Sequence, residues 1–425
     1  MRSRGMNWRK ISLWVCAVLI LCAAASAQKT AIIADELYSM AGGGPSGQPG
    51  VVLIENGKIV DVRPGHEAPA GYEVMHAAYA TPGLIDAKTT TGISGEYNIP
   101  ADQDQDEVTD PNTADVRAFD SFNSAERLLE FVNTYGVTTI QVAPGIVNPV
   151  AGQAAIFKTR GPESPLMTAE ELAVKPVSAI VFNLGESPKR AYGEKQKAPE
   201  TRMMTAEIIR KALLDAQVYE KKWEDWNKSD KKDASKQPAH DLKLEAVAAG
   251  LRGEILVIFN AYREDDIDTA LRLSREFHLK PIISSATEAY LMRDTLKAAG
   301  AAAFVGPTLE RIDSLETMNA TVENAALLSE GGIPVALMTG FEGYVPKNRV
   351  LLFEAAVAAV NGLGFEKALR ACTIDSARLL GIDGRVGSLE KGKDADVVLY
   401  DGDPFEYTSH VTAVLVDGRV TYRQK

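Results

Sequence analysis

The middle of the chain alternates short apolar runs with longer amphipathic stretches. The apolar runs have the length of buried strands and lie at 137–142, 177–184, 255–259, 281–284, 302–305 and 333–338. Amphipathic stretches with helical spacing, such as 265–277 and 288–299, follow them. Strands that alternate with helices in this order are typical of a parallel sheet covered by helices. About 300 residues separate Pro82 from Ile382, which suits a (β/α)8 barrel with insertions, although a doubly wound sheet fits the same pattern.

The two ends of the chain have the pattern of β structure. Apolar runs at 51–54 and 59–62 flank Asn56-Gly57, a pair that favours a tight hairpin turn. Near the C-terminus, β-rich runs at 395–400, 411–416 and 419–422 are separated by further Asp-Gly turns. We therefore expect β structure at both ends and an α/β region between them.

Residues 1–27 have the three-part layout of a secretory signal. Basic residues within 1–10 precede an apolar run from Ile11 to Ala25, and the small residues Ala25-Ser26-Ala27 end it. The run is shorter than the ~20 residues that span a bilayer, so cleavage after Ala27 is favoured over a permanent anchor. Cys22 would start a lipoprotein, but Leu21 stands where such signals have a small residue. We expect an exported protein, periplasmic or secreted, with no membrane segment after cleavage.

The chain is acidic, with 57 Asp and Glu against 46 Lys and Arg and a formal charge of −11. Removal of the basic signal makes it more negative still. An acidic exported protein binds polyanions poorly, so no nucleic-acid partner is expected. Cys372 is the one cysteine after residue 27, so the mature chain forms no internal disulfide, and this thiol is interpreted as a core residue.

Motifs at both borders of the α/β region resemble those of one family. Residues 81–86, Thr-Pro-Gly-Leu-Ile-Asp, are similar to the first-strand motif of the amidohydrolase superfamily. Residues 386–398 resemble that superfamily's return into its small β domain, and 373–381 match the helix before it. Residues 185–193 and 263–272 agree with the imidazolonepropionase-like branch. The motifs follow the family's order and cover the mature chain.

The resemblance implies an α/β fold with a (β/α)8 TIM-like barrel over 81–382. A small β-sandwich domain would be formed by 28–80 together with 383–425. Members of the superfamily hydrolyse C–N bonds, either non-peptide or dipeptide-like, with one or two divalent metals such as zinc. The metals polarise a carbonyl and activate water at the C-terminal ends of the strands.

The chain departs from this family at every metal-ligand position that the motifs identify. The ligand positions hold Lys88 and Thr90 on the first strand, Asn260 and Tyr262 on the fifth, Ser285 on the sixth and Gly340 on the eighth. The five histidines lie away from the expected strand ends: His66, His76, His240, His278 and His410. A metal site needs several convergent donors, so we expect no metal ligands and no bound cofactor.

The residues that replace the ligands, with their neighbours, form the candidate site. Lys88, Tyr262 and Asp86 are the candidates for acid–base chemistry, unless Lys88 fills the vacated cavity and pairs with Asp86 or Glu342. The candidates for substrate binding are Thr90, Asn260, Arg263, Ser285, Thr339, Glu186, Lys189 and Arg190. As an alternative, Asn260, Tyr262, Ser285 and Thr339 close the cavity as mutual partners, and Glu186, Lys189 and Arg190 stabilise a loop.

Two charged segments are interpreted as solvated. An acidic loop over 102–110 lacks the spacing of a calcium-binding loop. Residues 219–243 mix both signs of charge, and Trp223 and Trp226 are expected to anchor them to the body.

Two hypotheses on function remain open, and with them the question whether the protein is an enzyme. In the first, a degenerate, metal-free site binds a small molecule, or the chain is the partner of a catalytic amidohydrolase relative in a homo- or hetero-oligomer. In the second, the chain is an active, metal-independent C–N hydrolase that uses Lys88 and neighbouring polar residues. A secreted β-sandwich adhesin does not fit the alternating middle of the chain.

Overall fold

The computed structural model describes residues 29–229, 234–340 and 351–425. The expected signal, residues 1–27, lies outside the described residues, as does Glu342. Within the described ranges, no helix has the length and apolar character to cross a membrane.

The described residues form an eight-stranded sheet whose edges meet, so that it closes into a barrel. Its strand order is the reverse of the chain order: β12 (Val335–Leu337), β11 (Ala302–Val305), β10 (Pro281–Ser285), β9 (Leu256–Ala261), β8 (Ala173–Asn183), β7 (Val150–Lys158), β6 (Val137–Val142), β5 (Leu84–Thr89). Thr89 bridges to Gly340, and the Gly340 N–H donates to the Lys88 carbonyl at 3.0 Å. Buried apolar side chains such as Ile85, Val181 and Ile258 fill the interior. The predicted barrel is confirmed, and the doubly wound alternative was wrong.

Strand β7 departs from the expected parallel pattern. It pairs antiparallel with both β6 and β8, whereas the other neighbours in the barrel are parallel. Residues 143–149 join β6 to β7, and so short a link has no room for the crossover that a parallel strand requires. The strand was missed in the sequence, while each of the six apolar runs of the α/β region forms a strand.

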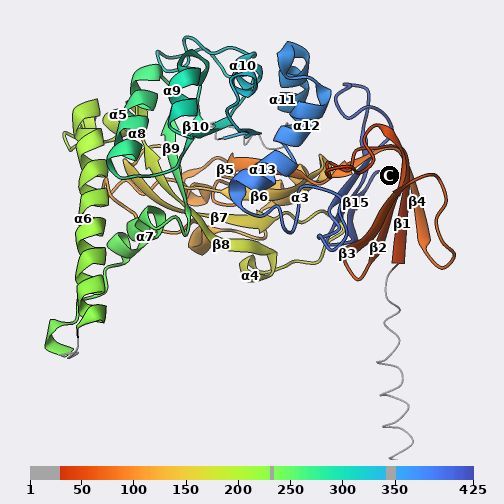
Figure 1. The fold of residues 1–425 in the computed structure, drawn as a ribbon, viewed down its shortest axis with the longest axis horizontal. Coiled ribbons are helices and arrows are strands. Elements are labelled where there is room, and N and C mark those ends of the chain that lie inside the picture. The colour runs from red at the N-terminus through yellow and green to blue at the C-terminus, as the bar shows by residue number, and fades with distance from the viewer. Residues whose placement is uncertain (1–28, 230–233, 341–350) are drawn as a thin grey trace, which may run out of the picture.

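Helices pack on the outside of the barrel (Figure 1). The predicted helix at 265–277 is confirmed by α8, and that at 288–299 by a 3₁₀ turn, Ala289–Met292, followed by α9. The α-helices are α2 (Ala118–Ser121), α3 (Arg127–Thr134), α4 (Ala169–Leu172), α5 (Glu186–Gly193), α6 (Arg202–Lys228), α7 (Leu242–Leu251), α8 (Glu264–Glu276), α9 (Arg293–Ala298), α10 (Asn324–Glu330), α11 (Leu351–Ala358), α12 (Phe365–Ala371) and α13 (Ile374–Leu380).

Helix α6 carries residues 219–228 of the charged segment that was expected at 219–243. Exposed pairs such as Lys221 with Asp225 line its solvent side at 2.6 Å. The half-buried Trp223 packs against the rings of Tyr219 and His240. This part of the segment is therefore a solvated helix with an aromatic anchor, as expected.

A second sheet combines strands from both ends of the described chain, seen as red and blue strands side by side in Figure 1. Its order is β15 (Arg419–Arg423), β14 (Val411–Val416), β13 (Val397–Tyr400), β4 (Glu73–Pro82), β1 (Lys29–Leu37), β2 (Gln48–Glu55), β3 (Lys58–Pro64). The predicted hairpin at Asn56-Gly57 joins β2 to β3, with positive φ at both residues. The domain boundaries at 80/81 and 382/383 stay a prediction, although β4 reaches Pro82.

The two border motifs meet in this second sheet. Pro82 lies opposite Val397 in the antiparallel pairing of β4 with β13, and the Gly83 N–H donates to the Asp396 carbonyl at 3.0 Å. Lys158, at the end of the barrel strand β7, contacts Asp396 at 2.5 Å and Asp394 and Asp417 at 3.3 Å each. A buried lysine with three carboxylate partners thus ties the barrel to the second sheet.

Candidate active site at the C-terminal face of the barrel

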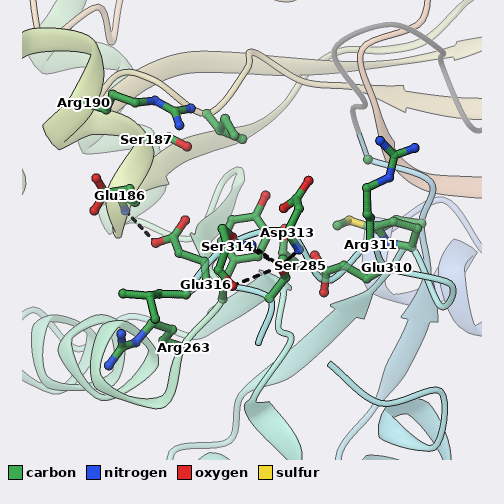
Figure 2. Close-up of a pocket in the computed structure, with 18 of the residues that line it drawn as sticks. Glu186, Ser187, Arg190, Arg263, Ser285, Glu310, Arg311, Asp313, Ser314 and Glu316 are labelled. Carbon is green, nitrogen blue, oxygen red and sulfur yellow. Dashed lines mark hydrogen bonds between the residues drawn. The ribbon is translucent and has the colours of Figure 1, made fainter. Parts of the chain in front are cut away.

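A cavity of about 850 Å³ opens where the barrel strands end. We call it the outer pocket. Of the candidate residues, Glu186, Arg190, Tyr262, Arg263 and Ser285 line it, and they follow or end β8, β9 and β10 (Figure 2). The segment after β11 adds Glu310, Arg311, Asp313 and Glu316 to the lining. The pocket therefore lies where barrels of this type hold their sites.

A second, much smaller cavity of about 20 Å³ adjoins it, with room for roughly one water molecule. We call it the inner cavity. Lys88, Thr90 and Asn260 line it without reaching the outer pocket. The residues common to both cavities are Ile146, Tyr262, Ser285, Met338 and Gly340. Most of the candidate residues are thus brought together in two connected layers.

The side-chain oxygen of Asn260 is the centre of the inner cavity's hydrogen bonds. It accepts from Lys88 Nζ at 3.3 Å, from the Ser284 hydroxyl at 3.0 Å and from the Ser285 hydroxyl at 2.8 Å. The two serines come from β10, which pairs with β9, and Lys88 comes from β5, which lies four strands from β9 in the sheet. Asn260 and Ser285 therefore contact each other, as the alternative of mutual partners predicted, whereas Thr339 of that alternative contacts Asp86.

Lys88 is buried, and burial lowers the pKa of its ammonium to about 8, against a smaller raising effect of the Asp106 carboxylate. The expected ion pair with Asp86 was wrong. Only the backbone N–H of Lys88 contacts that carboxylate, at 3.2 Å.

Asp86 is held by the last strand of the barrel instead. Its carboxylate accepts from the backbone N–H of Thr339 at 3.1 Å and from the Thr339 hydroxyl. Complete burial raises the pKa of Asp86 to about 7, although these hydrogen bonds act in the opposite direction. Asp86 and Thr339 line neither cavity, so their contact joins β5 to the end of β12 beneath the site.

Ser285 faces both cavities because its backbone is left-handed. Ser285 has φ +66° and Ala286 has φ +56°, and such a conformation costs roughly 1–2 kcal/mol for each residue that carries a Cβ. The Ala286 N–H donates to the Ala261 carbonyl at 3.0 Å, and Asn324 donates to the Ala286 carbonyl at 2.9 Å. Backbone strain of this kind is found at functional sites, where it fixes the direction of a side chain.

Two hydroxyl groups complete the inner cavity. Burial raises the pKa of Tyr262 to about 12, so its hydroxyl is a neutral donor near pH 7. The buried Thr90 hydroxyl has no hydrogen-bond partner within the residues described. Both can therefore serve a bound molecule.

The rim of the outer pocket contains an ion network that the sequence did not indicate. Arg202 contacts Asp266 at 3.0 Å and Glu316 at 3.6 Å, and Glu316 accepts from the backbone N–H of Glu186 at 2.6 Å (Figure 2). Gly185 has φ +92°, and a Cβ there would lie 2.2 Å from Glu316. The loop before α5 therefore depends on this glycine.

The other candidates at the rim have local partners. Lys189 pairs with the Glu186 carboxylate at 3.0 Å but does not line the pocket, while Arg263 pairs with Asp265 at 3.2 Å. Arg190 is exposed and faces the pocket. Lys189 thus has the local ion pair of a loop-stabilising residue, while Arg190 is open to the pocket.

The expectation of a solvated acidic loop was wrong for one residue. Asp106 is half-buried, accepts from the Val147 N–H at 3.2 Å, and lies close enough to Lys88 for each charge to affect the other. Burial raises the pKa of Asp106, and Lys88 lowers it. This carboxylate belongs to the site, and no periodicity in the sequence marks it.

The donors at the site do not fit a catalytic divalent metal. Across residues 29–229, 234–340 and 351–425, no three His, Cys, Asp or Glu side chains gather in a way that could hold a metal ion. Amide and hydroxyl oxygens surround an ammonium at the positions where the family has its ligands. Zinc and similar ions require imidazole, thiolate or carboxylate donors, so no chemical step is assigned to a metal here.

Comparison with known proteins agrees with the geometry. The model of the amidohydrolase family matches residues 285–422. A solved amidohydrolase from Thermotoga maritima is 34% identical, covers 92% of this chain and 100% of its own, and superimposes with a TM-score of 0.84.

Two further relatives are similar in sequence. An amidohydrolase, tasK, from Hapsidospora irregularis is 26% identical over 401 residues, which are 88% of this chain and 40% of that protein. An imidazolonepropionase from Syntrophobacter fumaroxidans is 39% identical over 79 residues, 18% of this chain and 19% of its own. This chain thus spans well under half the length of tasK. The local likeness to imidazolonepropionases agrees with the imidazolonepropionase-like branch. The full-length likeness to the Thermotoga protein shows that the chain belongs to the amidohydrolase superfamily, a group of C–N hydrolases.

Proposed function

We propose that this chain is a metal-free amidohydrolase relative that binds a small, polar molecule in the outer pocket. The contact of Lys88 with Asn260 carries the proposal. It puts a cation and an amide at two positions where the family has metal ligands, and a buried ammonium opposes the binding of a second positive charge.

The lining of the outer pocket supports a zwitterionic ligand. Four arginines and four carboxylates line it, at Arg190, Arg202, Arg263, Arg311, Glu186, Glu310, Asp313 and Glu316. A molecule that carries both charges, such as a dipeptide, can meet both kinds of side chain.

Elemental analysis of protein purified without chelators tests the metal-free site. We expect zinc, nickel, iron and manganese far below one per chain, and a stoichiometric amount of any of them would overturn the proposal. Thermal shift with dipeptides, N-acyl amino acids and cyclic amides tests binding. A shift that is lost in Arg190→Gln but kept in Arg210→Gln, an exposed and paired arginine on α6, supports the outer pocket.

A second candidate function is metal-independent hydrolysis of C–N bonds. The lowered pKa of Lys88 favours it, because an amine with a pKa of about 8 can act as a general base near neutral pH. Hydrolysis of the same compounds, insensitive to chelators and lost in Lys88→Ala, would support this function over binding alone.

We further propose that the protein is exported and acts beside a catalytic relative. The basic and apolar pattern of residues 1–27 supports export, and a retained barrel with substituted ligands supports a partner role. A mature N-terminus at Gln28 in the extracytoplasmic fraction is the expected result. A chain that keeps Met1 would contradict export.

A further inference from the structure

We propose that Lys88 is a nucleophilic amine, and that the inner cavity forms an imine with a small aldehyde or ketone that enters from the outer pocket. This inference builds on the metal-free site proposed above. It adds a covalent reaction that neither metal-dependent hydrolysis nor simple binding requires.

The surroundings of Nζ support this role. The ammonium of a lysine can donate three hydrogen bonds, yet within the described part of the chain Nζ makes one, to Asn260 at 3.3 Å. Lys88 is 5% exposed, so water does not replace the missing partners freely. An amine that is buried with so few partners exists readily in its neutral, nucleophilic form.

A second buried lysine in the same chain shows the contrast. Lys158 is 3% exposed and contacts three carboxylates, Asp394, Asp396 and Asp417. Burial alone would lower the pKa of Lys158, but the carboxylates outweigh it, so the pKa is raised. Lys158 therefore remains a protonated structural cation, whereas within residues 29–229, 234–340 and 351–425 no carboxylate is hydrogen-bonded to Nζ of Lys88.

The path to Lys88 is short. Tyr262, Ser285 and Ile146 line both cavities, so they form the layer between the outer pocket and the amine. The inner cavity is too small for more than a water-sized group, which restricts the part of the ligand that reaches Nζ to a carbonyl group.

The reaction is balanced within the site. The nitrogen lone pair forms a C–N bond with the carbonyl carbon, while the C=O π electrons move to oxygen, which takes a proton. The nitrogen then loses a proton to a nearby base and gives a neutral carbinolamine. The base returns this proton to the hydroxyl group, which leaves as water while the nitrogen lone pair forms the C=N bond, and the last N–H proton goes to the group that first protonated the oxygen. Tyr262 lines the inner cavity, and we assign its hydroxyl as the donor to the oxygen. Asp106 lies against Gly145, which also lines this cavity, and we assign its carboxylate as the base.

The expected reactivity follows from the fraction of neutral amine. With a pKa of about 8 instead of 10.5, the neutral fraction of Lys88 at pH 7 exceeds that of an ordinary lysine roughly 300-fold. Lys88 should therefore be modified at carbonyl concentrations that leave exposed lysines largely unmodified.

Reductive trapping tests the proposal on the full chain. Glycolaldehyde and sodium cyanoborohydride at pH 7 should add one group to the peptide that contains Lys88, with the mass of glycolaldehyde less one oxygen. Lys158 should stay unmodified, and Lys88→Arg should abolish the label. Asn260→Asp keeps Lys88 but places a carboxylate beside it, which stabilises the protonated amine. We therefore expect labelling of Lys88 to slow at least tenfold.

Labelling confined to exposed lysines, or equal at Lys88 and Lys158, would overturn the proposal, as would an unchanged rate in folded Asn260→Asp. Pyruvate as a second probe separates anionic from neutral carbonyl compounds, and trapping of either one supports the proposal. Metal content is measured separately, so failure of the metal-free site and failure of the imine are distinguishable.

Discussion

Nζ of Lys88 on β5 donates to the side-chain oxygen of Asn260 on β9 at 3.3 Å, and among the described residues this neutral amide is its one hydrogen-bond partner. We expect this arrangement to reduce stability. Lys88→Met should raise the free energy of unfolding at pH 7 by about 1–3 kcal/mol, because it removes a buried ammonium whose pKa is lowered to about 8 by burial. Urea unfolding followed by circular dichroism measures it. A loss of more than 1 kcal/mol would mean that Lys88 is structural.

The matched substitution at the other buried lysine, Lys158, should change the free energy of unfolding in the opposite direction. Lys158→Met leaves Asp394 and Asp396 buried without their shared cation, although Lys58 and Arg385 still contact Asp394. Breaking a buried ion pair costs roughly 3–5 kcal/mol. We expect a loss of stability of that size in the same unfolding experiment. An unchanged free energy of unfolding would show that the charges between the barrel and the second sheet rearrange.

The buried carboxyl of Asp86 should make stability depend on pH. Its folded pKa of about 7 exceeds the ordinary value of 3.8, so its contribution is complete below pH 4 and is lost as the pH rises to 7. This difference between the folded and ordinary pKa values of Asp86 corresponds to at most about 4 kcal/mol of unfolding free energy. Lys88, with a folded pKa of about 8, titrates above this window.

Unfolding free energies at pH 5 and pH 8 check this dependence. Wild type should be more stable at pH 5, and Asp86→Asn should be less sensitive to pH. Burial also raises the pKa values of Asp266 and Glu316, so the difference between wild type and variant isolates Asp86. An identical pH dependence in both proteins would contradict the prediction.

Gly185→Ala should damage the rim of the outer pocket. The new methyl group would lie 2.2 Å from Glu316, and φ is +92°. Gly253→Ala is the control, because Gly253 also has a positive φ but has open space around its Cβ position. We expect a loss of about 1 kcal/mol in the control and of 2 kcal/mol or more in Gly185→Ala. Equal losses would show that Glu316 moves aside without cost.

The strands could be predicted from the sequence where they are buried on both faces. The run before Asn260 is continuously apolar, and Ile282 and Ile283 precede the polar Ser284 and Ser285, so both strands have polar residues at the mouth of the barrel. Strand β7 was missed because it contains small residues such as Ala151 and Gly152, which give no clear period.

The contacts between residues of the site were harder to predict than the residues that belong to it. Asp86 and Lys88 are two residues apart on one strand, which favours a contact between their side chains, yet Thr339, which follows the last barrel strand of the chain, takes the carboxylate. The contact of Arg202 with Glu316 likewise depends on how the start of α6 and the segment after β11 come together. Sequence spacing holds no information about contacts between residues that lie far apart in the chain.

The pairing of β4 with β13 also sets an order for biosynthesis. Strand β4 borders β1 on one side, and its other edge stays uncovered until Val397–Tyr400 has left the ribosome. The second sheet is therefore completed only after the whole barrel has been synthesised. An unpaired strand edge invites association with other chains, so a protein truncated after residue 396 is expected to aggregate even though its barrel strands are complete.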